Sequence, residues 1–196
     1  MSPAGHLLLP PPVTTSTMTR ARPRYNRQVQ PTFTPPLRAA CFDWGGTLMS
    51  EAGPEALPMG AWPEVRAVAG ARDALALLHG HLPLCIATNA SVSDTTQIER
   101  ALARVGLAQF FSHVFCYTEL GCRKDEPAFW RAVSDRLGVP ATSLAMVGDS
   151  LEQDVRGPAR AGVQSVWFSA TAPVADRDVP RVAQLPEFAR LVLQAL

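Results

Sequence analysis

The sequence predicts an α/β fold in which a doubly wound, Rossmann-like parallel sheet forms a single domain. Short, mostly apolar runs whose apolar residues lie on both faces alternate along the chain with segments of helical periodicity. Strands without a polar face belong to sheets that are covered on both sides, which is the arrangement of parallel α/β folds. Polar residues gather directly after these runs, and ligands bind beyond the carboxyl ends of the strands in such sheets.

The first half of this fold is predicted from two strands and two helices. The apolar run at 39–44 is the first strand, and residues 64–78 form a helix because their apolar residues have mostly helical spacing. The second strand covers 82–87. Ser93 or Asp94 then caps a helix that extends to about Arg104 and is stopped by Gly106.

The second half continues the alternation. A third strand at 113–117 precedes a helix at 127–137 that Gly138 closes, and a fourth strand at 144–147 precedes a helix that reaches Ala161 despite Gly157-Pro158. A fifth strand at 164–169 and a loop at 173–180 lead to a last helix at 186–196, which has proline at an N-terminal position.

Residues 1–38 differ in composition from the rest of the chain. They contain five arginines, no acidic residue and several prolines, without apolar periodicity. Such a segment buries too little surface to offset its ordering entropy, so we expect a disordered tail before a domain at 39–196. The alternatives are a targeting peptide, an arm that binds a partner, or residues upstream of a true start at Met18.

The composition of the domain limits its function. Residues 39–196 have 13 basic and 17 acidic side chains, a balance that gives no reason to propose nucleic acid as a substrate. No apolar run approaches the roughly 18 residues that span a bilayer. The four cysteines form neither a disulfide framework nor a zinc site. We therefore expect a reduced, cytoplasmic protein, while its oligomeric state is left open.

The polar residues after the predicted strands share a chemistry. Carboxylate oxygens suit Mg²⁺, and a lysine with hydroxyl and amide groups suits a phosphoryl group. An aspartate can itself be phosphorylated and then hydrolysed. A single aspartate after a strand is more often a turn former, so the complete set predicts the site. The set is Asp43, Thr47, Thr88, Asn89, Lys124, Asp149 and Asp154.

Four segments resemble, in order, the motifs of the haloacid dehalogenase superfamily, whose members are mostly phosphatases. The first is Cys41-Phe42-Asp43-Trp44-Gly45-Gly46-Thr47-Leu48, and Ile86-Ala87-Thr88-Asn89 is similar to the second. Gly121-Cys122-Arg123-Lys124-Asp125-Glu126-Pro127 resembles the third, and Val147-Gly148-Asp149-Ser150 with Asp154 the fourth. The resemblance covers nearly the whole chain beyond residue 38.

The resemblance implies a Mg²⁺-dependent phosphohydrolase or phosphotransferase that acts through an aspartyl phosphate. Asp43 would be the nucleophile, and Thr88, Asn89 and Lys124 would bind the phosphoryl group. The metal would be held by Asp43, by Asp149 and by the backbone carbonyl of Gly45, with Asp154 steering nearby ligands. The partner would be a small or macromolecular phosphorylated substrate.

Position 45 departs from the pattern, because most phosphatases of this family have aspartate there as general acid and base. Gly45 keeps the carbonyl but lacks the proton shuttle, which is typically worth about 10²–10⁴-fold in rate. Three explanations remain open: a substrate with a good leaving group, a proton supplied by Glu51 or Glu55, or a catalytically weak phosphate-binding or regulatory protein. Dehalogenase or phosphonatase chemistry is less favoured, because those branches use a helical cap.

The segment at 49–63 predicts little or no cap. Its three prolines and two glycines disfavour the helical insertion that closes over the substrate in capped members. We expect an open site. Trp44 and Trp62 either line its mouth or pack against the sheet edge.

Overall fold

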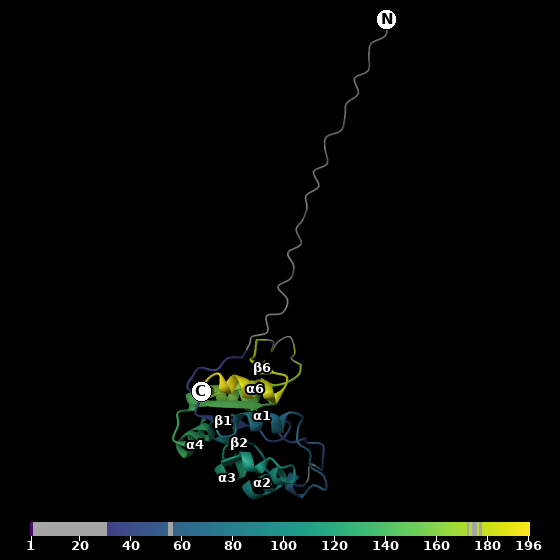
Figure 1. The fold of residues 1–196 in the computed structure, drawn as a ribbon, viewed down its shortest axis with the longest axis vertical. Helices are drawn as coiled ribbons and strands as arrows, with labels where there is room; N and C mark the ends of the chain where they lie inside the picture. Colours follow the sequence, from purple (N-terminus) through teal and green to yellow (C-terminus); the bar gives the residue numbers. More distant parts are fainter. Residues whose placement is uncertain (2–30, 55–56, 172, 174–175, 177) are drawn as a thin grey trace.

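A six-stranded parallel sheet forms the centre of the computed structural model, which describes residues 1, 31–54, 57–171, 173, 176 and 178–196 (Figure 1). The strand order is β3-β2-β1-β4-β5-β6, so the predicted doubly wound parallel fold is confirmed. The strands are β1 (Ala39–Phe42), β2 (Leu84–Thr88), β3 (His113–Cys116), β4 (Leu144–Gly148), β5 (Gln164–Phe168) and β6 (Arg181–Val182).

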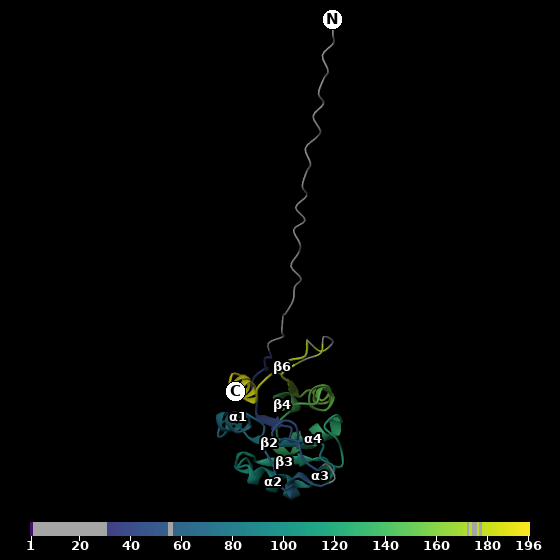
Figure 2. The same cartoon turned by 90° about the vertical axis from the view of Figure 1, so that its right-hand side faces the viewer.

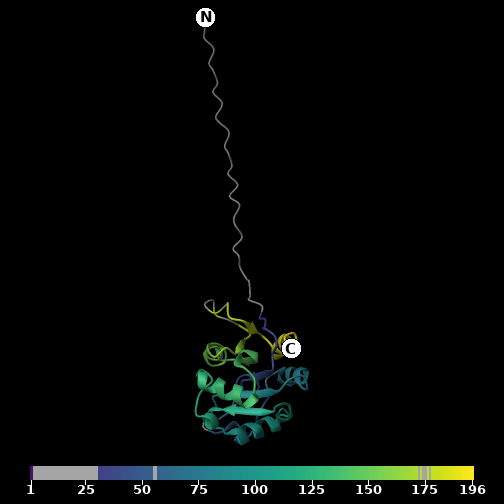
Figure 3. The ribbon, with the colours of Figure 1, turned by 90° about the vertical axis from the view of Figure 1, so that its left-hand side faces the viewer.

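Helices cover both faces of the sheet, as Figures 2 and 3 show from opposite sides. On one face α1, α2 and α6 pack over Ala40 and Phe42 of β1, and on the other α4 packs over Ala39 and Cys41. Adjacent strand residues thus face different cores. The helices are α1 (Ala71–Leu78), α2 (Thr95–Arg104), α3 (Tyr117–Leu120), α4 (Pro127–Leu137), α5 (Gly157–Arg160) and α6 (Leu185–Leu193).

The chain reverses its direction of winding between β1 and β4. It first adds β2 and β3 on one side of β1, then returns to place β4, β5 and β6 on the other. The backbone N–H of Asp43 donates to the carbonyl of Val147 at 2.9 Å, which keeps the two strand ends together. A crevice outside the carboxyl ends at such a reversal is where ligands bind in open α/β sheets.

Capping signals place α2 and α4 as predicted. The Asp94 carboxylate accepts from the backbone N–H of Gln97, and the Gln97 side chain accepts from the backbone N–H of Asp94, so both ends of a capping box are present. Helix α4 has proline in its first turn and ends at Gly138, whose φ of 68° is the left-handed conformation that favours glycine.

The helix predicted for 64–78 is wrong over its first seven residues, because α1 begins at Ala71. Instead the backbone N–H of Val68 donates to Leu48 and that of Ser50 to Arg66, both at 2.9 Å. Pairing with a distant segment therefore takes the hydrogen bonds that a helix would use. Gly70, with φ of 79°, turns the chain into the shortened helix.

The end of the chain also differs in detail from the prediction. The sheet has a sixth strand, β6, at 181–182, immediately after the predicted loop. The segment after β4 is not a continuous α-helix: a π-helical turn, η4 (Leu151–Arg156), precedes α5. Such turns are frequent at functional sites.

Residues 31–38 pack against the domain, so the boundary predicted at residue 38 is too late. The Leu37 side chain is buried, and its N–H donates to the carbonyl of Ala195 at 2.8 Å. The ring of Phe33 contacts that of Phe188 edge-on, with centroids 5.8 Å apart. The disorder predicted for the remainder of the tail, residues 2–30, lies outside the described residues.

No helix in the described part of the chain is both long enough and apolar enough to cross a membrane.

Candidate active site

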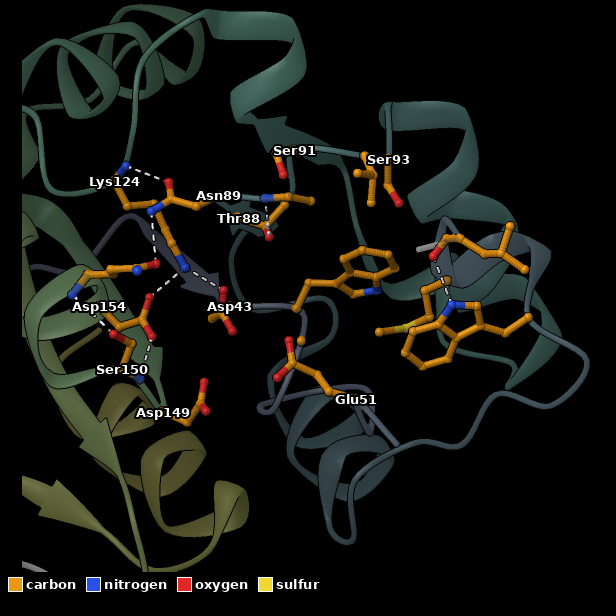
Figure 4. Close-up of a pocket in the computed structure, with 18 residues that line it drawn as sticks. Asp43, Glu51, Thr88, Asn89, Ser91, Ser93, Lys124, Asp149, Ser150 and Asp154 are labelled. Atoms are coloured by element: carbon orange, nitrogen blue, oxygen red, sulfur yellow. Dashed lines mark hydrogen bonds and ion pairs between the residues drawn. The ribbon is translucent and has the colours of Figure 1, made fainter. Parts of the chain in front are cut away.

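A pocket of about 470 Å³ opens at the carboxyl ends of the central strands (Figure 4). The residues that the family resemblance assigns to the site all line it: the three aspartates, Gly45, Thr88, Asn89 and Lys124. They come from the end of β2, from the segments that directly follow β1, β2 and β4, including η4, and from the turn before α4. The topology thus brings together side chains that lie up to 111 positions apart in the sequence, from Asp43 to Asp154.

Lys124 occupies the middle of this pocket. Its ammonium group bonds to Asp43 and, at 2.5 Å, to Asp154 (Figure 4). The side chain is almost completely buried, as is that of Asp154. Lys124 is also the only lysine in the chain, a signal in the sequence that singles it out more strongly than the motif spacing does.

Hydrogen bonds fix the position of the Lys124 backbone. Its N–H donates to Asn89 Oδ1 at 2.8 Å, and its carbonyl accepts from Trp130 Nε1 at 2.6 Å. Asn89 Nδ2 donates in turn to Gln153 Oε1 at 3.0 Å. Asn89, which the motif places in substrate binding, therefore also ties the turn before α4 to η4. Gln153 is a lining residue that the sequence did not indicate.

Different interactions hold the side chains of Asp154 and Asp149. The second oxygen of Asp154 accepts from the Ser150 backbone N–H at 2.8 Å, and a Cβ on Gly148 would lie 2.2 Å from the Asp154 carboxyl carbon, so only glycine leaves room there. Asp149 is exposed. Its carboxylate accepts from Thr47 Oγ1 at 3.2 Å, and its N–H donates back to that oxygen at 3.1 Å.

The concentration of carboxylates shifts their proton affinities. Burial, followed by the charge of Asp43, raises the pKa of Asp154 to about 7 although Lys124 acts in the opposite direction. The same two causes raise the pKa of Asp149. Burial alone would lower the pKa of Lys124, but the charges of Asp43 and Asp154 raise it overall. The site therefore has an excess of negative charge that one ammonium group does not cancel.

The donor set fits Mg²⁺. One carboxylate oxygen each of Asp43, Asp149 and Asp154 lie within 4.8 Å of one another, and hard oxygen ligands with room for waters and substrate oxygens are what this ion takes. Burial and the charge of Asp43 raise the pKa values of Asp149 and Asp154, and a divalent cation would favour their charged forms.

Two glycines after Asp43 shape the backbone next to the carboxylates of Asp149 and Glu51. Gly46 has φ of 73°, and a Cβ on it would lie 2.4 Å from Asp149 Oδ2. Gly45 lines the pocket, and a Cβ there would meet Glu51. The loop therefore passes close to both carboxylates. Any larger residue at position 46 would displace the carboxylate of Asp149.

The far wall of the pocket comes from the segment after the first motif. Of the two alternatives for Trp44 and Trp62, the structure shows that both side chains line the pocket, and both are also buried. Trp62 Nε1 donates to the carbonyl of Leu57 at 2.9 Å, and Arg104 Nη1 donates to the Trp62 carbonyl at 2.6 Å. Apart from the short 3-10 turn η1 (Met59–Ala61), the described residues of this segment form no helix, in agreement with the prediction of little or no cap.

Comparison with known proteins supports the motif-based assignment. A family model described as haloacid dehalogenase-like hydrolase matches residues 59–162, just over half of the chain. This range includes Thr88, Lys124, Asp149 and Asp154 but begins after Asp43. A phosphoserine phosphatase from Thermus thermophilus is 40% identical over 86 residues, 44% of this chain and 33% of that protein.

Solved structures extend the likeness of the fold beyond the matched sequence. An uncharacterized protein from Listeria monocytogenes superposes with a TM-score of 0.68 at 24% identity, over 81% of this chain and 98% of that chain. The HAD-hydrolase YfnB from Bacillus subtilis, solved with magnesium bound, has a TM-score of 0.56 at 25% identity, over 65% and 56%. The chain spans between a third and a half of the length of the curated relatives that it matches.

Proposed function

This chain belongs to the haloacid dehalogenase-like hydrolases, and on that premise we propose that it is a Mg²⁺-dependent phosphohydrolase with Asp43 as its nucleophile. The observation that carries the proposal is the position of Asp43: its carboxylate bonds to Lys124 and converges with those of Asp149 and Asp154 inside one pocket. A small phosphomonoester is the proposed substrate, supported by the named activity of the Thermus thermophilus relative.

Mg²⁺, held by Asp43, Asp149 and the carbonyl of Gly45, would supply positive charge that offsets the repulsion between a carboxylate and a phosphate. Asp154 then has two tasks. It holds Lys124 in place through their ion pair, and it keeps negative charge beside the metal position. Both tasks are consistent with its complete burial and its bond to the Ser150 backbone.

The residues around Asp43 would divide the chemistry among themselves. An Asp43 oxygen attacks phosphorus, the bond from phosphorus to the leaving oxygen breaks, and the leaving oxygen takes up a proton. Lys124 and Thr88 bind the equatorial oxygens, where the transferring group spreads its charge. Water then attacks the aspartyl phosphate, which releases phosphate and regenerates the Asp43 carboxylate.

A second candidate is a catalytically weak phosphate-binding protein, favoured by one observation: position 45 has no side chain to transfer a proton. General acid–base help is typically worth about 10²–10⁴-fold. Such a protein would bind Mg²⁺ and phosphate in the same pocket with little turnover.

Phosphate release separates the two candidates. A panel of amino-acid, sugar and nucleotide phosphates would be tested with and without Mg²⁺, using the unaltered protein and Asp43→Asn. The matched control is Asp73→Asn, the same change at an exposed position on α1. We expect Mg²⁺-dependent release that Asp73→Asn retains and Asp43→Asn loses, with a phosphoryl group found by mass spectrometry on the Asp43 peptide. Binding of Mg²⁺ and phosphate without release would favour the second candidate.

A further inference from the structure

The space beside Gly45 is occupied by another residue's carboxyl group. A Cβ built on Gly45 would lie 2.3 Å from Glu51 Oε1 and 3.0 Å from the Glu51 carboxyl carbon. An aspartate at position 45 would have its carboxyl oxygens two bonds beyond that Cβ. Glu51 Oε1 therefore lies in the volume that the missing aspartate side chain would fill.

Glu51 reaches this position from a backbone that is held on both sides. The N–H of Ser50 donates to the carbonyl of Arg66, and the Glu51 carbonyl accepts from the N–H of Gly53, each at 2.9 Å. On the other side of the turn, the N–H of Met49 donates to Trp44 at 2.9 Å. The side chain lines the same pocket as Asp43, and its carboxyl end faces Asp43 and Asp149 (Figure 4).

Carboxyl groups from four residues line the described part of this pocket. Among the described residues that line it, the acids are Asp43, Glu51, Asp149 and Asp154. Asp43 and Asp154 bond to Lys124, and Asp149 bonds to Thr47. No described lining residue is a histidine. Of these acids, Glu51 is the one whose carboxyl oxygen lies where a side chain at position 45 would be, and this position suits a proton transfer at the pocket mouth.

We propose that Glu51 is the general acid and base of this site, and that it takes over the task that an aspartate at position 45 would have. This inference rests on the proposed phosphohydrolase function. In the first step the protonated Glu51 carboxyl gives its proton to the leaving oxygen as the phosphorus–oxygen bond breaks. In the second step the Glu51 carboxylate takes a proton from the water that attacks the aspartyl phosphate, so each cycle returns Glu51 to its starting form.

The test is Glu51→Gln, which keeps the shape of the side chain and removes the transferable proton. Its control is Glu64→Gln, whose exposed side chain pairs with Arg66 and is not among the residues that line the pocket. Each variant is assayed with an alkyl phosphate, whose leaving group needs a proton, and with p-nitrophenyl phosphate, whose leaving group does not. Rapid mixing records the burst of nitrophenol and the steady rate that follows.

We expect Glu51→Gln to lower kcat/KM for the alkyl phosphate by about 10²–10³-fold, within the range for general acid–base catalysis. The burst with p-nitrophenyl phosphate should keep its rate, while the steady rate falls and phosphorylated Asp43 accumulates. A structural defect would slow the burst as well. In Glu51→Ala, which leaves this volume empty, the further change Gly45→Asp should restore alkyl phosphate turnover, because it returns a carboxyl group to the same place.

Two results would overturn the inference: unchanged alkyl phosphate turnover in Glu51→Gln, or an equal loss in the burst and in alkyl phosphate turnover without rescue by Gly45→Asp. In both, the unaltered protein remains an active phosphohydrolase, so the proposed function survives. If the unaltered protein releases no phosphate from either substrate, the proposed function fails, and the inference about Glu51 fails with it.

Discussion

Lys124 is the residue on which the electrostatics of the site depend. Its ammonium group is the shared partner of two buried carboxylates, Asp43 and Asp154. Transferring such groups out of water is costly unless each retains a partner. Hydrogen bonds of its backbone with the side chains of Asn89 and Trp130 fix the position from which the Lys124 side chain extends.

We expect Lys124→Met to lower the free energy of unfolding by about 3–5 kcal/mol, the usual cost of removing one partner of a buried ion pair. Urea unfolding without Mg²⁺ measures this. Arg66→Met is the control, because its ion pair with Glu64 is exposed and such pairs contribute only about 0–1 kcal/mol. Equal stability of the two variants would show that the Lys124 contacts stabilise the fold no more than a surface pair does.

The titration of Asp154 predicts how stability depends on pH. Its pKa is raised from the ordinary value of 3.8 to about 7 in the folded protein, and that of Asp149 is also raised. The folded state therefore binds protons more tightly than the unfolded state, and stability falls as pH rises through this interval. The pKa of Lys124 is also raised, but this group changes the stability only as pH rises above 10.5, its ordinary pKa.

In the absence of Mg²⁺ we expect the urea midpoint to fall between roughly pH 4 and pH 7 and to change less above that interval. Asp154→Asn should flatten the slope, since it removes the group that titrates. Mg²⁺ should raise the midpoint more at pH 8 than at pH 5, because protons no longer compete for the carboxylates. A midpoint that rises steadily from pH 4 to pH 7 would contradict the raised pKa values.

At the scale of elements, the loop after β1 determines how closely the backbone approaches the Asp149 carboxylate. Gly46 and Gly80 both have positive φ, at 73° and 84°. A Cβ on Gly46 would lie within 3 Å of three Asp149 carboxyl atoms, whereas one on Gly80 would meet nothing within 4 Å. The two glycines therefore separate the cost of the left-handed conformation from the cost of displacing the Asp149 carboxylate.

Both Gly46→Ala and Gly80→Ala should lose about 1–2 kcal/mol of stability from the left-handed backbone. Only Gly46→Ala should also weaken Mg²⁺ binding, because the new methyl group displaces Asp149. Isothermal titration calorimetry with MgCl₂ measures the affinity without any substrate. Equal Mg²⁺ affinity in the two variants would mean that the loop tolerates a side chain, and that Asp149 is not constrained by its approach.

At the scale of the whole molecule, the segment at 31–38 packs against the last helix, α6, and the residues that follow it. Leu37 bonds through its backbone to Ala195, and the rings of Phe33 and Phe42 both contact Phe188 of α6. The boundary predicted from composition at residue 38 cuts through this contact. The segment at 31–38 thus contributes to the core that covers one face of the sheet.

A chain that begins at Ala39 should be less stable than one that begins at Pro31 by at least about 1.5–3 kcal/mol, which is the contribution of burying one leucine side chain such as Leu37. Thermal and urea unfolding of the two chains measures the difference. Phe33→Ala in the longer chain is the intermediate case, because it removes the ring contact and retains Leu37. Coincident transitions of the two truncated chains would show that the contacts of residues 31–38 add nothing to stability.

The sequence by itself determined the features that depend on local signals. Apolar runs located β1 to β5, capping residues located α2 and α4, and the strand-end rule predicted that the three aspartates, Thr88 and Lys124 would share one pocket. These predictions succeeded because hydrogen bonding, capping and side-chain alternation act over a few residues. The topological rule for parallel sheets then converts strand ends into a common site.

Only the tertiary structure decided what depends on distant partners. The start of α1 at Ala71 depends on hydrogen bonds to residues 48–50, and the order of residues 31–38 depends on contacts with Ala195 and Phe188. Whether Glu51 or Glu55 approaches Gly45 was likewise open in the sequence, and Glu55 lies outside the described residues. The carboxyl group beside Gly45 belongs to Glu51, because long-range pairing of the loop backbone, and not sequence spacing, sets where that side chain points.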